Sequence, residues 1–355
     1  MSEPRRGRRV VRAPNHLGEV VMSLPALAEA AEEARRSSGK PLLVQVVSGL
    51  CPILQMARLD AEIIPLEDRR AVLRGAAELR RRGAARGVLL TPAISAAVIF
   101  LLAGVASRRG VSVRGRSWML TEAVDREPLL TGHRVLEYMH LVGPGRTPSD
   151  PPPPRLACSD EARRAWRALG ERLGLGAAAG STVALFPGAN ASSRRWPTER
   201  FTRLAGWLAR EGHRVLVLGG PGERQLTARV ADGGAAGAGE IWDLGGRTTL
   251  EELVGALCAC DVLVTNDTGP MHVAAALDRP IVALEGAADL RQTRPLGSRV
   301  RIVGHFELSC VPCVKNECPR TGRGFALPEA ERECMRLITV DAVHEAVASL
   351  LERST

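Results

Sequence analysis

A run of prolines near the middle of the chain sets the strongest limit on what it can fold into. Residues 143–155 read GPGRTPSDPPPPR. Four consecutive prolines cannot continue a helix or a central strand, and they form a stiff, extended spacer. The chain has 355 residues, which is enough for two domains that each bury a core. We therefore predict a linker at 146–156, between an N-terminal domain at 1–145 and a C-terminal domain at 157–335.

Both halves alternate short apolar strands with helices. The N-terminal half predicts strands at 9–13, 41–47 and 88–90 and an amphipathic helix at 20–35. The C-terminal half repeats the pattern, with strands at 182–186, 215–218, 262–265 and 281–284 and helices at 199–210, 223–231 and 250–258. Such alternation is typical of parallel sheets covered by helices on both faces. The predicted fold class is therefore α/β, with two doubly wound, Rossmann-like domains that face a cleft and bind ligands at the carboxyl ends of their strands.

The positive charge is concentrated in the first half. Residues 1–150 hold 23 Lys and Arg against 15 Asp and Glu, while residues 151–355 hold 25 against 24. A basic half attracts anions such as nucleic acid, a phosphorylated substrate or an anionic membrane, although a merely solvated basic surface explains it equally well. Aromatic residues make up only 3% of the chain, which disfavours binding of nucleic acid by base stacking.

The termini and the apolar stretches predict a chain that stays in the cytoplasm. The first residues contain arginines without the apolar run and cleavage site of a secretory signal. The apolar stretch 88–106 is interrupted by Thr91 and Pro92, so we expect a buried strand and a buried helix rather than a membrane span. In the cytoplasm the eight cysteines are expected to be reduced, and a cysteine cluster then indicates a metal site before a disulfide. Cys258 and Cys260 are expected in the core.

The segment 261–286 is the strongest candidate for a phosphate site. It predicts a strand, a polar turn with Asn266, Asp267, Thr268 and Gly269, and a helix that starts near Pro270. The free N–H groups and the positive dipole end of such a helix favour a phosphate. His272 lies in the first turn of this helix. The alternative is a capped helix with a buried histidine.

Two further loops of the C-terminal half carry charged residues after predicted strands. Arg194 and Arg195 follow the strand at 182–186, and guanidinium groups suit a diphosphate because they pair with its oxygens and keep their charge. Glu223 follows a glycine-rich turn from which it can reach a ribose hydroxyl, although this turn lacks the dinucleotide fingerprint. An exposed basic loop and an ordinary turn are the alternatives.

The first strand of the chain leads into a loop with Asn15, His16 and Gly18, and Glu19 begins the following helix. A carboxylate in the first turn is stabilised by the helix dipole, which explains Glu19 without any function. The other hypothesis is that Glu19 faces the cleft as a general base.

Taken together, these segments resemble the ADP-heptose–lipopolysaccharide heptosyltransferases, which are inverting glycosyltransferases of GT-B architecture. The resemblance covers most of the chain. It rests on four segments in one order: LGEVVMSLPAL at 17–27, PGA and RRWP within 187–197, WDLGGRTTLEELVGAL at 242–257 and DTGPMHVAAAL at 267–277.

The resemblance implies roles for the candidate residues. Asp267, Thr268, Gly269 and His272 match the donor diphosphate site, Arg194 stands where the family commonly has a lysine, and Glu223 matches the ribose-binding acid more loosely. Glu19 occupies the position of the family's catalytic aspartate. This departure puts the base in question, since an extra methylene moves the carboxylate by about a bond length, and misplacements of that size are costly.

The resemblance also implies a mechanism and partners. Glu19 takes the proton of an acceptor hydroxyl as that hydroxyl attacks the donor sugar, while the helix terminus, His272 and Arg194 stabilise the departing diphosphate. We therefore expect no catalytic metal. The acceptor is expected to be a phosphorylated, lipid-linked oligosaccharide that the basic first half meets at the cytoplasmic face of the inner membrane, with no nucleic acid as partner.

A cysteine-rich segment at 310–334 precedes the C-terminus. The spacing of Cys310, Cys313, Cys318 and Cys334 favours a structural Zn²⁺, with an iron–sulfur cluster as second choice and unpaired thiols as the alternative. An amphipathic helix within 336–355 is expected to pack back on the N-terminal domain, as is typical of GT-B enzymes.

Two other functions stay open. A transferase for another nucleotide-linked sugar would use nearly the same phosphate and ribose contacts. A non-catalytic, basic, metal-binding protein would use the arginine-rich half and the cysteine segment, but it would leave the donor motif unexplained.

Overall fold

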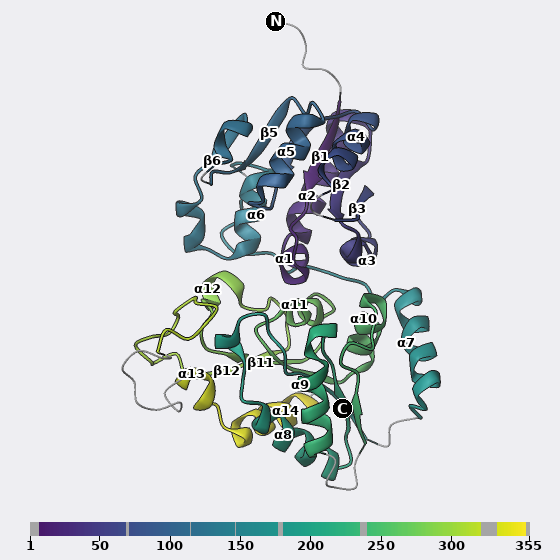
Figure 1. Ribbon diagram of the computed structural model, residues 1–355, viewed down its shortest axis with the longest axis vertical. Coiled ribbons are helices and arrows are strands. Elements are labelled where there is room, and N and C mark those ends of the chain that lie inside the picture. Colours follow the sequence, from purple (N-terminus) through teal and green to yellow (C-terminus); the bar gives the residue numbers. More distant parts are fainter. Residues whose placement is uncertain are drawn as a thin grey trace, which may run out of the picture. The chain divides into compact units, whose positions relative to one another are not determined.

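The computed structural model divides the chain into two compact units, Met1–Ala157 and Cys158–Thr355 (Figure 1). It describes residues 7–68, 71–113, 115–145, 147–176, 180–234, 240–320 and 332–352. Residue 146 of the predicted linker and residues 321–331 of the predicted cysteine-rich segment therefore lie outside the described residues.

The N-terminal unit is a six-stranded parallel sheet in the order β3-β2-β1-β4-β5-β6. Its strands are β1 (Arg8–Arg12), β2 (Leu42–Val47), β3 (Ala61–Leu66), β4 (Ala84–Leu89), β5 (Ser107–Val111) and β6 (Glu122–Val124). Its helices are α1 (Leu17–Met22), α2 (Leu24–Ser38), α3 (Cys51–Met56), α4 (Val72–Arg81), α5 (Ile94–Leu102) and α6 (Arg134–Val142). Short 3-10 turns lie at Ser48–Leu50, Ser117–Met119 and Glu127–Thr131.

The long apolar stretch 88–106 forms the end of β4 and the helix α5. Ala96, Ala97 and Phe100 of this helix are buried in the core of the unit, which explains its apolar character. In the described part of the chain, no helix combines the length and the apolar character needed to cross a membrane.

The C-terminal unit is a second parallel sheet, in the order β12-β11-β10-β7-β8-β9. Its strands are β7 (Thr182–Phe186), β8 (Arg214–Val217), β9 (Ile241–Asp243), β10 (Val262–Asn266), β11 (Ile281–Glu285) and β12 (Val300–Gly304). Its helices are α7 (Asp160–Leu173), α8 (Thr198–Arg210), α9 (Arg224–Gly234), α10 (Leu250–Ala259), α11 (Gly269–Ala276), α12 (Leu290–Thr293), α13 (Glu333–Arg336) and α14 (Val340–Leu351). Two 3-10 turns lie at Ser192–Arg194 and Pro221–Glu223.

The α/β prediction of two doubly wound parallel sheets is confirmed. In each sheet the strand order reverses beside the first strand of the unit, between β1 and β4 in one and between β7 and β10 in the other. In open parallel sheets this reversal separates the flanking loops and leaves room for a ligand at the carboxyl ends of the strands.

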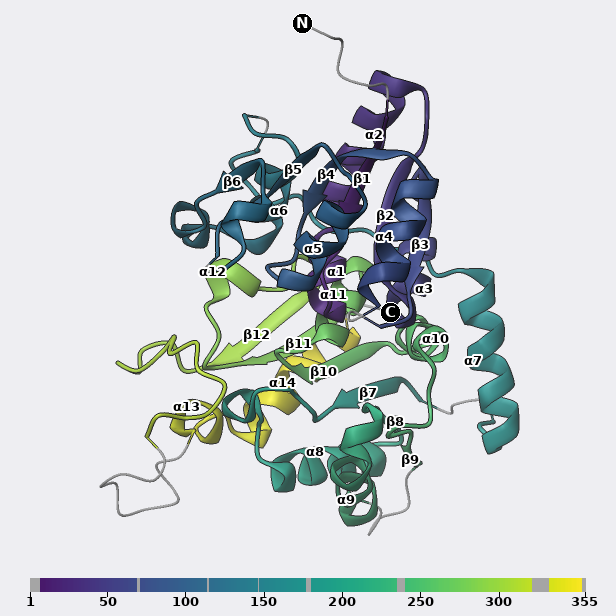
Figure 2. The same cartoon turned by 45° about the horizontal axis from the view of Figure 1, so that its top comes forward.

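The last helix packs within the C-terminal unit. Val340, Val343, Val347 and Leu350 of α14 are buried in the core of this unit. The helix packs on α8 and on β10, β11 and β12, under the sheet in Figure 2. Its predicted packing on the N-terminal domain stays a prediction.

The cysteines correct one expectation. Cys158, before α7, and Cys258, on α10, form a disulfide with their Cα atoms 6.3 Å apart, so not all of the thiols are reduced. The disulfide joins two helices that already pack on each other. Cys260 is buried, as predicted for a core residue.

Candidate active site

The C-terminal unit gathers its candidate residues where the strand order reverses, at the carboxyl ends of β7 and β10. These strands are paired in register, with Phe186 opposite Thr265. The chain therefore leaves both strands at the same level, and the loop 187–197 lies beside the turn 267–269.

Asn266, the last residue of β10, ties the two loops together. It is fully buried, its Oδ1 accepts a hydrogen bond from the backbone N–H of Trp196 (3.0 Å), and its Nδ2 donates to the carbonyl of Pro187 (2.8 Å). The sequence predicts Asn266 in the polar turn after this strand, without a role of its own. The sequence feature that points to this role is an amide side chain at the end of an otherwise apolar strand, because a buried amide needs hydrogen-bond partners.

Arg194 and Asp267 form an ion pair across this junction. Nη1 of Arg194 lies 2.7 Å from Oδ2 of Asp267. The Asp267 side chain is only 4% exposed, whereas that of Arg194 is 27% exposed. Burial raises the pKa of Asp267, and the Arg194 guanidinium lowers it. The carboxylate thus holds the guanidinium at the surface of the loop, where it can meet an anion.

The turn after Asp267 presents hydrogen-bonding groups that the protein leaves unused. Thr268 precedes α11 in an extended conformation and does not cap the helix with its side chain. Its buried Oγ1 has no hydrogen-bond partner among the described residues. The helix then begins at Gly269, and His272 is buried in its first turn. A helix N-terminus with a free hydroxyl and a neighbouring guanidinium is suited to a phosphate.

Glu223 reaches the same edge from β8. Its Oε2 accepts a hydrogen bond from the backbone N–H of Gly220 (2.7 Å). The carboxylate packs directly over Gly188, where an added Cβ would lie 1.8 Å from Oε1 of Glu223. Arg195 instead donates from Nε to the carbonyl of Ala189 (2.8 Å), within its own loop. The structure therefore brings Glu223 to the loop after β7, and its predicted contact with a ribose stays a prediction.

The N-terminal unit has a corresponding junction between β1 and β4. Nδ2 of Asn15 donates to Oγ1 of Thr91 (3.2 Å), and Oδ1 of Asn15 accepts from Nη2 of Arg12 (2.6 Å). Asn15 therefore bridges the carboxyl ends of the two strands. In the same loop His16 is exposed and Gly18 is buried.

Glu19 lies in the first turn of α1, half-buried, beside two residues of α6. Tyr138 is fully buried, and burial first, then the negative charge of Glu19, raise the pKa of its hydroxyl well above the ordinary value. Arg134 also interacts with Glu19 and forms an ion pair with Glu137. Tyr138 is the only tyrosine of the chain. Tyr138 and Arg134 thus place a protonated hydroxyl and a positive charge beside the Glu19 carboxylate.

Two buried arginines of this unit were not predicted. Arg12 and Arg116 are almost completely buried, and burial lowers the pKa of each to about 10. Arg116 donates to the carbonyl of Thr91 and packs over Gly110, where an added Cβ would lie 2.6 Å from Nη2. Positive charge thus lies directly beneath the loops at the ends of β1 and β4.

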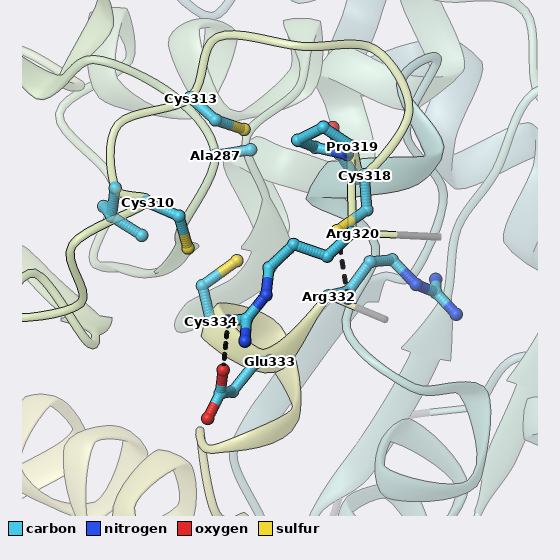
Figure 3. A pocket seen from close by; sticks show the side chains of 11 residues that line it. Ala287, Cys310, Cys313, Cys318, Pro319, Arg320, Arg332, Glu333 and Cys334 are labelled. Atoms are coloured by element: carbon cyan, nitrogen blue, oxygen red, sulfur yellow. Dashed lines mark hydrogen bonds and ion pairs between the residues drawn. The ribbon is translucent and has the colours of Figure 1, made fainter. Parts of the chain in front are cut away.

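The four cysteines of the C-terminal segment line one cavity (Figure 3). Cys310, Cys313 and Cys318 belong to the loop after β12, and Cys334 belongs to α13. The side chain of Arg320 lies among them and forms an ion pair with Glu333. Among the described residues, no three His, Cys, Asp or Glu side chains are placed as ligands of one metal ion.

The cysteine loop is hydrogen-bonded to two loops of the candidate site. The backbone N–H of Ser193 donates to the carbonyl of Asn316 (3.1 Å), next to Arg194. The backbone N–H of Val314 donates to the carbonyl of Ala287 (2.8 Å), just after β11. The cysteine segment therefore supports the loops that flank the Arg194–Asp267 pair.

Fold and site together define a class of protein. Two doubly wound units in one chain, one of them with an arginine and a helix N-terminus at its strand reversal, have the architecture of GT-B glycosyltransferases.

Comparison with known proteins agrees with this class. Residues 72–322 match glycosyltransferase family 9 (heptosyltransferase). The chain is 29% identical over 245 residues to lipopolysaccharide heptosyltransferase 2 of Salmonella typhimurium, and 28% identical over 232 residues to the enzyme of that name from Escherichia coli. Each alignment covers 63% of this chain and 66% of the relative, just under two thirds of its length.

Solved structures extend the similarity to nearly the whole chain. The ADP-heptose lps heptosyltransferase II of E. coli superposes with a TM-score of 0.77 at 25% identity, over 98% of this chain and 99% of that one. A family 9 glycosyltransferase from Veillonella parvula shares the fold, with a TM-score of 0.76 at 20% identity over 99% of each chain. The chain belongs to glycosyltransferase family 9, the heptosyltransferase family, and both the predicted family and the GT-B fold are confirmed.

Proposed function

We propose that this protein transfers a heptose from ADP-heptose to a hydroxyl of the lipopolysaccharide inner core, with inversion at the anomeric carbon. Its family membership supports a glycosyltransferase, and the names of its relatives support this donor and acceptor. The observation that carries the proposal is the Arg194–Asp267 ion pair beside the unused Thr268 hydroxyl at the start of α11. This arrangement supplies a cation, a hydroxyl and free backbone N–H groups for one diphosphate.

The departing diphosphate gains negative charge in the transition state. Arg194, Thr268 and the N-terminus of α11 supply the opposite charge and hydrogen bonds for it, and His272 lies in the same helical turn. These groups are sufficient for charge stabilisation, so the reaction is expected to need no catalytic metal. Glu223 then serves as a hydrogen-bond acceptor for the ribose.

Glu19 acts as the general base that takes the proton of the acceptor hydroxyl. The neighbouring Tyr138 and Arg134 support this role, because they place a hydroxyl and a positive charge beside the carboxylate. Asn15, His16 and Gly18 form the loop that meets the acceptor. The extra methylene of a glutamate is accommodated by placing the side chain against α6.

The acceptor is an anionic, lipid-linked oligosaccharide. The net charge of +8 on residues 1–150, from 23 basic and 15 acidic residues, favours contact with such a molecule and with the anionic inner leaflet. The protein would therefore work in the cytoplasm, bound peripherally at the cytoplasmic face of the inner membrane.

Calorimetric titration with ADP, UDP and ADP-heptose in EDTA tests this proposal. Tight binding of ADP and ADP-heptose with no binding of UDP is the expected result. A preference for UDP would keep the fold but replace the donor, and absence of binding would favour a non-catalytic protein. Turnover that requires added Mg²⁺ would contradict the metal-free transfer.

We also propose that Cys310, Cys313, Cys318 and Cys334 bind a structural Zn²⁺, with an iron–sulfur cluster as the second choice. Four thiols lining one cavity suit either group. Binding would require the thiols to converge and Arg320 to leave the centre of the cavity. The metal would then brace the hydrogen bonds that hold Ser193 and Ala287.

Elemental analysis of the purified protein tests the metal directly. We expect about one zinc per chain, loss of this zinc in Cys334→Ser and its retention in Cys51→Ser, since Cys51 lies in the N-terminal unit. Protein without bound metal, and with the same melting temperature before and after chelation, would contradict the site.

A further inference from the structure

A buried glutamate at the end of β11 has no role in the function proposed so far. Glu285 is 1% exposed, and neither of its carboxyl oxygens has a hydrogen-bond partner among the described residues. An ionised carboxylate without partners is strongly disfavoured in a protein interior, so the group is expected to keep its proton.

The charges around Glu285 belong to the donor site. Leu284 is paired in register with Asn266, so the next residues, Glu285 and Asp267, lie side by side at the ends of β11 and β10. On the other side, β12 places Gly304 opposite Glu285, without a charge. Burial and the charge of Asp267 raise the pKa of Glu285 well above its ordinary value, and Arg194 opposes the shift. His272 is the other titratable group of this turn.

The alternation of side chains separates Glu285 from the cysteine cavity. A Cβ added to Gly286 would lie 2.8 Å from the sulfur of Cys334, so residue 286 faces the thiols. Successive residues of a strand point to opposite faces, and Glu285 therefore points away from them. Its environment is the Asp267–Arg194 pair.

We propose that Glu285 is a positioning residue of the donor site: its protonated carboxyl, which lies beside Asp267 without a hydrogen-bond partner in the residues that the structure describes, turns to donate a hydrogen bond to Asp267 and so weakens the hold of Asp267 on Arg194. The inference rests on the proposed function, because it assigns Arg194 to the donor diphosphate. In the protein without ADP, Arg194 then carries one positive charge. Asp267 and Glu285 together carry one negative charge and share one proton.

This arrangement couples nucleotide binding to protonation. When the diphosphate of ADP pairs with Arg194, the buried Asp267 loses the guanidinium as its partner. Asp267 then also lies near the negative charge of the diphosphate. The two carboxyls titrate as one unit, and the unit takes up a second proton from solution. ADP binding should therefore take up one proton, and above neutral pH its affinity should fall about tenfold for each pH unit.

Calorimetry of the full chain with ADP measures this proton. Titrations at about pH 8, where the phosphates of free ADP contribute little, are run in buffers of different ionisation enthalpy. The observed enthalpy should indicate nearly one proton per ADP for the unmodified protein and for Glu161→Gln, an exposed carboxylate on α7. Asp267→Asn should bring the count close to zero.

Two substitutions at Glu285 separate its hydrogen bond from its bulk. Glu285→Leu removes the donor and should weaken ADP binding several-fold, and Glu285→Gln, which still donates, should restore it. Saturable ADP binding without proton uptake, or equal affinities for the leucine and glutamine variants, would overturn the inference. The proton count of the unmodified protein decides the question even if the leucine variant does not fold. Absence of ADP binding to the unmodified protein would instead contradict the proposed function.

Discussion

Replacing Glu285 with glutamine should stabilise the protein, and the gain should grow with pH. Glutamine keeps the size of the side chain and the ability to donate a hydrogen bond, but it cannot ionise. In the native protein, burial and Asp267 raise the pKa of Glu285 well above its ordinary value. In the unfolded chain the carboxyl is released to a pKa of about 4.3. The folded state thus keeps a proton that the unfolded state loses.

The sign of the pH dependence follows from this difference. Below about pH 4, both states are protonated, and the contribution of Glu285 to stability is fully present. As the pH rises toward the folded pKa, the unfolded chain gains by ionising, and the free energy of unfolding falls by about 1.4 kcal/mol per pH unit. Glutamine does not ionise in the unfolded chain, so the free energy of unfolding of the Glu285→Gln variant does not fall for this reason. Between pH 5.5 and 7.5 its advantage should grow by about 3 kcal/mol.

Urea unfolding at the two pH values measures this advantage. Tryptophan fluorescence is a suitable probe, because Trp166, Trp196, Trp207 and Trp242 all lie in the C-terminal unit. Glu161→Gln serves as the matched control and should show no such trend. Parallel stability curves for the Glu285→Gln variant and the unmodified protein would mean that Glu285 is ionised when folded, and would refute the reasoning.

Four further substitutions test the sites. Glu19→Gln should lower kcat by about 100-fold or more with unchanged ADP affinity, as expected for loss of a general base, and full turnover would remove Glu19 from that role. Tyr138→Phe should lower kcat several-fold in the same assay without changing the melting temperature, since only a hydroxyl beside Glu19 is lost. Gly188→Ala should weaken ADP binding, because its Cβ would displace Glu223. Gly222→Ala is the control and should not weaken binding, since no atom lies within 4 Å of the added carbon. Equal ADP affinities of the two variants would contradict the packing of Glu223 on Gly188. Asn266→Ala should destabilise the C-terminal unit by about 2 kcal/mol in urea unfolding, since two loops lose their hydrogen bonds, and an unchanged midpoint would argue against this junction.

The central strands were predictable from sequence, and the edge strands were not. The buried strands β7, β8, β10 and β11 read as β-branched runs because both of their faces are covered. By contrast, β3 contains Pro65, which is tolerated because this strand lies at the edge of its sheet, and β5, the strand next to the other edge, has the sequence SRRGV. Apolar periodicity carries no signal where a strand is half covered. The predicted helix 20–35 is two helices, α1 and α2, because Pro25 lacks the N–H that a continuous helix needs.

The same contrast holds for the site. The place of Asp267, Thr268 and Gly269 was predictable, because a polar turn between an apolar strand and a proline-started helix lies at the carboxyl edge of a parallel sheet. Asn266 was predicted in the same turn and Glu285 at the end of an apolar strand, but the sequence pattern is silent on the partners of both. Their roles depend on which strands are neighbours, and that follows from the sheet order rather than from local sequence.

The two strand reversals handle buried charge in different ways. At the ends of β7 and β10, Arg194 faces Asp267 and Glu285, so cation and acid are balanced within one cluster. At the ends of β1 and β4, Arg12 and Arg116 donate to backbone carbonyls, and neither forms an ion pair within the described part of the chain. Carbonyls satisfy the hydrogen bonds of a guanidinium but leave its charge uncompensated. In the proposed function, the first junction exchanges its acid partner for the donor diphosphate, whereas the second keeps a positive charge beneath Asn15 that would attract the anionic acceptor.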